Sequence, residues 1–148
     1  MQPLQFLVPL DAVEALAPVL PLVVFGLVVL NILTRLLQHR KHAAQADEDD
    51  DGAVQRWLPH TLTTLGMVFA SFLFMIVEPH GGMVMSVLAL SVFVSDFFEF
   101  ESRRVEARSK SKSLERPTAA IGASVFALLY AGYQGFFYLI EPLWNSII

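Results

Sequence analysis

All ten Lys and Arg residues of this 148-residue chain can lie on the same side of a membrane. The sequence contains four long apolar runs, at about 18–38, 58–77, 83–100 and 118–140, and a helix needs about 20 apolar residues to cross the hydrocarbon layer of a bilayer. The basic residues fall between the first and second runs, between the third and fourth runs, or at the adjoining ends of those runs. Because basic loops remain in the cytoplasm, we predict four transmembrane helices with both termini outside and cytoplasmic loops at 39–57 and 101–117. The basic residues are Arg35, Arg40, Lys41, Arg56, Arg103, Arg104, Arg108, Lys110, Lys112 and Arg116.

The apolar runs also decide the fold class. They are continuous and lack the two-residue alternation of barrel strands, so they predict helices. We therefore expect an all-α, polytopic membrane protein in which residues 1–148 form one domain in the plasma membrane.

The third helix is expected to continue beyond the membrane to Arg108, and residues 78–82 (EPHGG) are expected to form a tight outer turn. Asp11 is expected to cap a short helix in the outer interface.

The two halves of the sequence resemble each other. Each half contains a span, a basic loop and a second span, and the second spans end in IVEP (76–79) and LIEP (139–142). Such self-similarity can mark a duplicated helical hairpin. Chance recurrence of a short exit motif is the alternative, and both interpretations stay open.

The fourth run carries a small residue at every fourth position. A stripe of this kind lets another helix approach closely, which favours helix association in lipid. The partner is either another span of the same chain or a second subunit, and the second case predicts a homo-oligomer or a larger membrane complex. The stripe consists of Ala119, Ala123, Ala127, Ala131 and Gly135.

Polar residues within the apolar runs are candidates for a functional site. A charge at the centre of the hydrocarbon layer costs roughly 2.5–3.5 kcal/mol on insertion scales. Arg35 and Asp96 are at similar depths in spans that run in the same direction, so an ion pair between them would offset this cost, with Glu99 close by and Asn31 one turn further in. Such residues either have a structural role, as a lock for the bundle or as charges that snorkel to the interface, or belong to a proton or ion relay or a polar cavity open to the cytoplasm. We favour the structural role.

A second polar group is expected at the outer ends of the helices, from Asp11, Glu78, His80 and Glu141. Carboxylates and a His can hold a divalent cation. Exposed acids at helix ends produce the same pattern, however, and no metal is predicted because the sequence has no H-E-x-x-H spacing.

No cofactor is predicted. A membrane haem b needs two His residues that face each other inside the bundle, whereas His39, His42 and His60 are all expected at the cytoplasmic interface. The absence of Cys excludes disulfides and thiolate ligands. The sequence also lacks a P-loop, a G-x-S-x-G elbow and a G-x-G-x-x-G loop after a strand, so no catalytic residue is predicted.

The loops indicate contact with lipids. They are short and lack interleaved aromatic residues, which argues against nucleic-acid binding, and their Lys and Arg residues are expected to meet anionic headgroups. The acidic run at 47–51 (DEDDD) is expected to be solvated and flexible.

Together these features favour a non-enzymatic structural or accessory membrane subunit that packs through small-residue helix faces. A small homo-oligomeric transporter or channel is the first alternative, because four-helix subunits can pair around a pathway. The second alternative is a redox or quinone-linked membrane subunit.

Three segments carry a resemblance to a known family: MQPLQFLVPLDAVEALAPVLP, VEPHGGMV and SDFFEFESRRVEAR. They resemble a family of small, uncharacterised four-helix integral membrane proteins of halophilic archaea, and the resemblance covers essentially the whole chain. It implies a salt-rich cytoplasm, which is consistent with the acidic run and the lack of Cys. It implies no activity, cofactor or catalytic residue.

Overall fold

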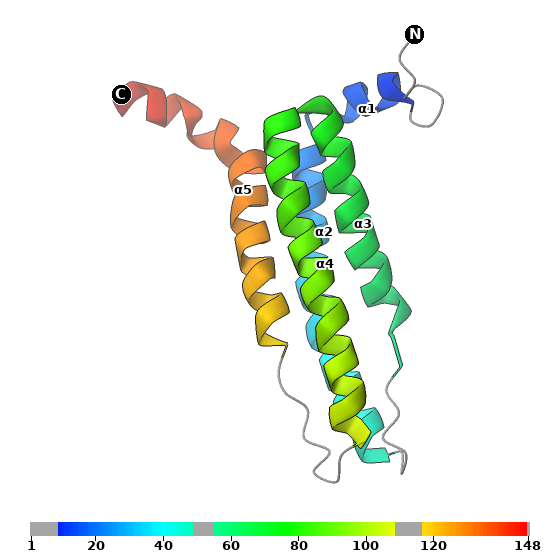
Figure 1. Ribbon diagram of the computed structural model, residues 1–148. Coiled ribbons are helices and arrows are strands. Elements are labelled where there is room, and N and C mark those ends of the chain that lie inside the picture. The colour runs from blue at the N-terminus through cyan, green and yellow to red at the C-terminus, as the bar shows by residue number, and fades with distance from the viewer. Residues whose placement is uncertain (1–8, 49–54, 109–116, 148) are drawn as a thin grey trace.

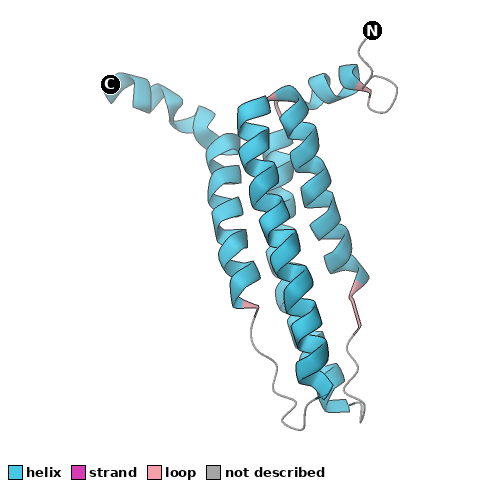
Figure 2. Ribbon diagram, in the orientation of Figure 1, coloured by secondary structure: helices cyan, strands magenta, loops and turns pink. Residues whose placement is uncertain are grey.

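The computed structural model describes residues 9–48, 55–108 and 117–147, and all the regular structure in these ranges is helical (Figures 1 and 2). The helices are α1 (Leu10–Leu16), α2 (Leu20–Glu48), α3 (Leu58–Val77), α4 (Pro79–Arg108) and α5 (Thr118–Ile147). Four of them, α2 to α5, are long and apolar enough to cross a membrane. The predicted all-helical class is therefore confirmed for the described part of the chain.

The four long helices form a bundle in which each helix runs antiparallel to its neighbours (Figure 1). α3 packs between α2 and α4, and α5 closes the ring by packing on both α4 and α2. We call the end at which α2 ends and α3 begins the loop end. We call the opposite end, with the turn between α3 and α4, the turn end; α1 and the end of α5 also lie there (Figure 1).

The buried residues of each long helix recur at spacings of mainly three and four, which is the pattern of helices that pack side by side in a bundle. In the half near the turn end the core is apolar, and Ser71 and Ser86 supply its buried hydroxyls. In the half near the loop end the same spacings place polar and charged side chains in the core. The bundle thus has an apolar half and a polar half. The polar half contains Asn31, Arg35, Gln38, His42, His60, Thr64, Asp96, Arg103 and Ser124.

Two helices extend beyond their predicted ends. α2 continues to Glu48, so the predicted loop at 39–57 begins as helix. Residues 39–48 contain mostly good helix formers such as Lys, Arg, Ala and Gln, and His42 is buried against the bundle, which holds this extension in place. α5 continues through Pro142 to Ile147, where an end near residue 140 was predicted, and its last part leaves the bundle (Figure 1). The third helix ends at Arg108 as predicted.

The short helix α1 forms, but Asp11 does not cap it. The residue before the helix is Pro9, with no side-chain hydrogen bond, and Asp11 lies inside the first turn. A carboxylate there still interacts favourably with the positive end of the helix dipole. Most of the acidic run at 47–51 and the basic segment at 109–116 lie outside the described residues.

The turn between α3 and α4 is tighter than predicted. Glu78 alone separates the two helices, and residues 79–82 already form the first turn of α4. The Gly82 amide donates to the Glu78 carbonyl oxygen at 2.8 Å. This reversal brings Gly82 against the backbone of Met75, where a side chain would collide with it.

The small-residue stripe of α5 is largely used within the chain. Ala127, Ala131 and Gly135 are buried, but Ala123 is half-buried and Ala119 is exposed. Residues spaced exactly four apart drift around a helix with 3.6 residues per turn, so the first and last residues of the stripe cannot lie on the same face of α5. The buried face begins instead with Ala120 and Ser124.

Candidate functional site

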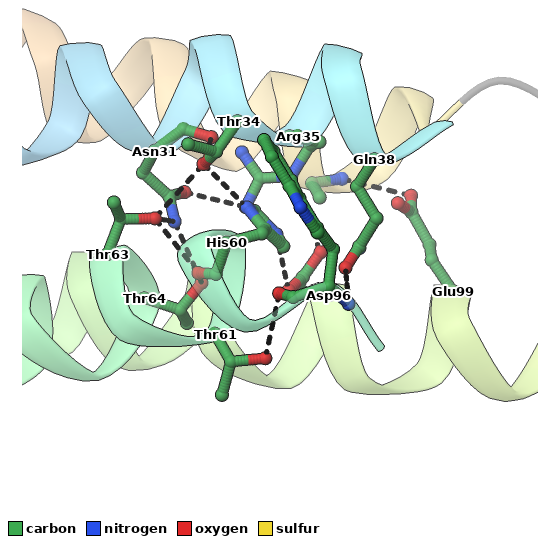
Figure 3. A network of polar contacts seen from close by, with 12 residues as sticks. Asn31, Thr34, Arg35, Gln38, His60, Thr61, Thr63, Thr64, Asp96 and Glu99 are labelled. Atoms are coloured by element: carbon green, nitrogen blue, oxygen red, sulfur yellow. Dashed lines mark hydrogen bonds and ion pairs between the residues drawn. The ribbon is translucent and has the colours of Figure 1, made fainter. Parts of the chain in front are cut away.

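The centre of the polar half is Arg35, whose side chain is fully buried. Its three guanidinium nitrogens reach three helices. Nε lies 3.4 Å from Asp96 Oδ1 on α4, Nη1 donates to Ser124 Oγ on α5 at 2.7 Å, and Nη2 donates to Asn31 Oδ1 on α2 at 2.7 Å. The structure thus brings together Asn31, Arg35 and Asp96, three of the four residues that the sequence suggested for this network (Figure 3).

Asp96 has a second partner, His60 on α3. His60 Nε2 lies 2.8 Å from Asp96 Oδ2, and Nδ1 of the same ring lies 2.8 Å from Thr34 Oγ1. Both ring nitrogens are therefore engaged, and the carboxylate is held from two sides. Figure 3 shows this chain of contacts passing from α2 through His60 to α4.

Asn31 extends the network towards the apolar half. Its Nδ2 donates to Thr64 Oγ1 at 2.7 Å and to Thr63 Oγ1 at 3.1 Å. Both threonine hydroxyls donate in turn to the His60 carbonyl oxygen, one turn earlier in α3. The network ends there, because the next buried residues of α2 and α3 are Val28 and Met67.

The network is closed, in the sense that the polar atoms of Arg35, Asp96 and His60 find partners within the bundle. A buried charge is strongly destabilising when it is unpaired, and a buried network adds rigidity and uniqueness when every member is satisfied. This network also contacts all four long helices. We therefore expect it to help fix their mutual register, which apolar side chains alone specify less strictly.

Glu99 belongs to a different part of the bundle. Its Oε1 accepts from the Ala120 amide at 3.0 Å, at the N-terminus of α5. A carboxylate there satisfies a free helix amide and meets the positive end of the helix dipole. Its Oε2 lies 3.7 Å from Arg103 Nη2. Glu99 thus ties α4 to α5 and does not bond to the Arg35–Asp96 pair.

A second polar cluster, nearest the loop end, joins the extension of α2 to α4. Arg103 Nη1 lies 2.9 Å from His42 Nδ1, and His42 Nε2 lies 2.7 Å from the carbonyl oxygen of Gln55. The geometry fits a neutral ring that donates through Nε2 and accepts at Nδ1. Gln38 accepts from the Trp57 amide just before α3.

The hydrogen bonds of the two buried histidines bear on whether these residues could act as axial ligands of a haem. Both ring nitrogens of His42 and of His60 are taken up by neighbouring groups, and the two rings bond to different partners. Neither offers a free nitrogen in this arrangement, which a pair of axial haem ligands needs.

The residues of the predicted outer group lie at the turn end but do not form a metal site. Glu78, His80 and Glu141 are exposed, and Asp11 is exposed on α1. Within the described ranges no three His, Asp or Glu side chains are arranged to hold a metal ion.

Three residues of the network around Arg35 were not anticipated as members of it: Ser124, Thr34 and His60. A polar residue near the end of a span resembles an interfacial residue in sequence. The spacing of residues in the sequence could have shown that His60 is buried. Steps of alternately three and four residues mark the buried face of α3, and these steps join His60, Thr64, Met67, Ser71 and Phe74.

A family model described as a domain of unknown function (DUF7313) matches residues 2–148. No curated protein and no solved structure matches the chain. Because the family model covers nearly every residue, the chain belongs to the DUF7313 family.

Proposed function

We propose that the protein is a non-enzymatic integral membrane protein that acts as a structural or accessory subunit in the plasma membrane. The observation that carries the proposal is the closed network around Arg35, which joins four helices that are each apolar enough to cross a membrane. A transport pathway needs polar groups that can exchange partners along the bundle. Among the described residues the buried charged groups are confined to one half, and buried apolar side chains fill most of the core of the other half, where Ser71 and Ser86 supply the buried hydroxyls.

The proposed topology has the loop end in the cytoplasm and both termini outside. It is supported by the basic residues, all of which lie either in the half of the bundle near the loop end or in the two connections at that end. The resemblance to membrane proteins of halophilic archaea adds the expectation of a salt-rich cytoplasm at this end. Exposed Leu, Phe and Val side chains along the four long helices supply the apolar surface that lipid or a partner would cover.

The topology has a direct test, because the chain contains no Cys. We expect Ser146→Cys, on the exposed end of α5, to react with a membrane-impermeant maleimide in intact cells. Ser111→Cys, between α4 and α5, should react only after the cells are lysed. The cysteine-free parent is the control for background labelling. The opposite pattern, or equal labelling of both sites in intact cells, would exclude the proposed orientation.

The accessory role is tested by purification. Tagged protein extracted from its native membrane in a mild detergent is expected to retain other membrane proteins in fixed stoichiometry, measurable by mass spectrometry. An unrelated four-helix membrane protein with the same tag is the control for non-specific partners. A homo-oligomer without other proteins, together with solute or ion flux in reconstituted vesicles, would contradict this role and favour a transporter.

A further inference from the structure

A cavity of about 280 Å³ opens on the flank of the bundle between α3 and α4, close to the loop end. Asp96 and Thr64, both part of the closed network, form its inner side. The opening faces away from the bundle axis. In the proposed membrane orientation, it faces lipid at the level of the cytoplasmic headgroups.

The inner side of the cavity can accept hydrogen bonds. The Asp96 carboxylate is almost completely buried and has one contact with Arg35 and one with His60. An ionised carboxylate has about four lone-pair positions, so it can accept a further bond from a ligand hydroxyl. Thr61 Oγ1, also in the lining, makes only a long bond to the Trp57 carbonyl oxygen at 3.4 Å, and it can donate to or accept from the same ligand.

The mouth of the cavity carries a positive charge, Arg56. Its guanidinium carbon lies 4.0 Å from the ring centre of Phe100, so the cation packs on an aromatic ring of α4. The nearest carboxylate, Glu101, is 3.8 Å away and lies closer to Arg104, at 3.3 Å. Arg56 therefore keeps donors available, and a guanidinium fork fits the oxygens of a phosphate.

The remaining lining is apolar. Leu65, Phe93 and Phe97 form the wall and are all partly exposed on the flank of α3 and α4. This surface continues from the cavity along the two helices through further exposed apolar residues such as Phe69 and Leu90. It provides a path for a hydrocarbon chain that is attached to a polar group inside the cavity.

We propose that this cavity binds the headgroup of one anionic phospholipid that carries hydroxyl groups. Its phosphate lies on Arg56, its hydroxyl on Asp96 and Thr61, and its hydrocarbon chain along Leu65 and Phe93. In such a lipid the phosphate lies between the headgroup hydroxyls and the hydrocarbon chains, so the hydroxyls enter the cavity, the phosphate stays at its mouth on Arg56, and the chain follows the exposed flank of α3 and α4. The inference rests on the proposed membrane location of the bundle.

The test compares three lipids added to purified protein in detergent, with native mass spectrometry as the readout. Phosphatidylglycerol has a phosphate and free hydroxyls, phosphatidic acid has the phosphate without them, and phosphatidylcholine has a zwitterionic headgroup, with a phosphate and a quaternary ammonium but no hydroxyls. We expect one retained phosphatidylglycerol per chain, bound at least several-fold more tightly than the other two. Arg56→Gln should weaken this binding about tenfold, because a charge-assisted bond to phosphate is lost.

Two further variants show where the lipid binds. Arg104→Gln is the matched control, because Arg104 has almost the same exposure as Arg56 and pairs with the same Glu101 but does not line the cavity. It should change binding less than twofold. Thr61→Val should weaken phosphatidylglycerol binding but leave phosphatidic acid unchanged.

Equal retention of the three lipids, or equal losses in the Arg56 and Arg104 variants, would overturn the inference. Extraction of the membrane fraction with alkaline carbonate distinguishes a failure of the lipid-site inference from a failure of the proposed membrane location. A chain that stays in the membrane but shows no lipid preference contradicts only the lipid site. A chain released by carbonate contradicts the membrane location as well.

Discussion

Asp96→Asn is expected to destabilise the bundle by about 3–5 kcal/mol, the range measured when one partner of a buried ion pair is removed. The substitution keeps the size of the side chain and removes its charge. Arg35 then remains fully buried, bonded to the neutral side chains of Ser124 and Asn31 but without its nearest carboxylate. The protein cannot readily relieve this by exposing Arg35, because the Arg35 side chain itself is fully buried among the four long helices.

The measurement is unfolding by sodium dodecyl sulfate in mixed micelles, followed by tryptophan fluorescence in a Trp144→Phe background, so that the signal comes from Trp57, which lies close to the network just before α3. Glu101→Gln is the control, since Glu101 forms exposed ion pairs with Arg56 and Arg104 that are expected to contribute less than about 1 kcal/mol. A loss for Asp96→Asn no larger than for this control would show that the network does not lock the bundle.

A double substitution isolates the ion pair itself. Arg35→Met removes the charge but retains a long, unbranched side chain. If Arg35 and Asp96 stabilise the bundle through each other, the double variant should lose about 0.5–3 kcal/mol less than the sum of the two single variants. Unchanged stability of Asp96→Asn combined with a loss of flux in vesicles would instead assign Asp96 to a transport pathway.

The parts of this fold that follow from local sequence were predictable. A long continuous apolar run predicts a helix, so the existence and order of α2 to α5 follow from the hydropathy pattern, although α2 and α5 extend beyond their apolar runs. The pairing of Arg35 with Asp96 was also accessible, because two opposite charges at equal depth in parallel spans have few other ways to offset their burial. The structure places them 3.4 Å apart.

The parts that depend on how helices turn against one another were not predictable. Glu99 is only three residues from Asp96, yet this spacing places its side chain on the side of α4 that faces α5, where its carboxylate accepts from the Ala120 amide. His60 has the sequence context of an interfacial residue, and only the register of α3 against α2 places it between Thr34 and Asp96. The end of α2 was misjudged for another reason: hydropathy falls at residue 39, whereas helix formation depends on propensity and on the burial of His42.

Gly82→Ala is expected to destabilise the bundle by about 3 kcal/mol, the upper part of the range for overpacking a well-packed site. An alanine Cβ at this position would lie 2.7 Å from Met75 Cβ and closer still to the backbone of Met75. Backbone atoms cannot move aside as a flexible side chain can. The variant must therefore open the turn at Glu78 or shift α3 along α4, which also strains the contact between His60 and Asp96 at the far end.

Gly26→Ala is the matched control, because no atom outside the helix lies within 4 Å of the added Cβ. It should stabilise the protein by about 0.5–1 kcal/mol, since alanine loses less conformational freedom than glycine in the middle of a helix. Both variants are measured by the same unfolding assay. Opposite signs for the two glycines would establish that Gly82 is required by the close approach of α3 and α4 and not by glycine content as such. A neutral Gly82→Ala would mean that the turn can widen freely, and the register of α3 and α4 would then depend on the polar network alone.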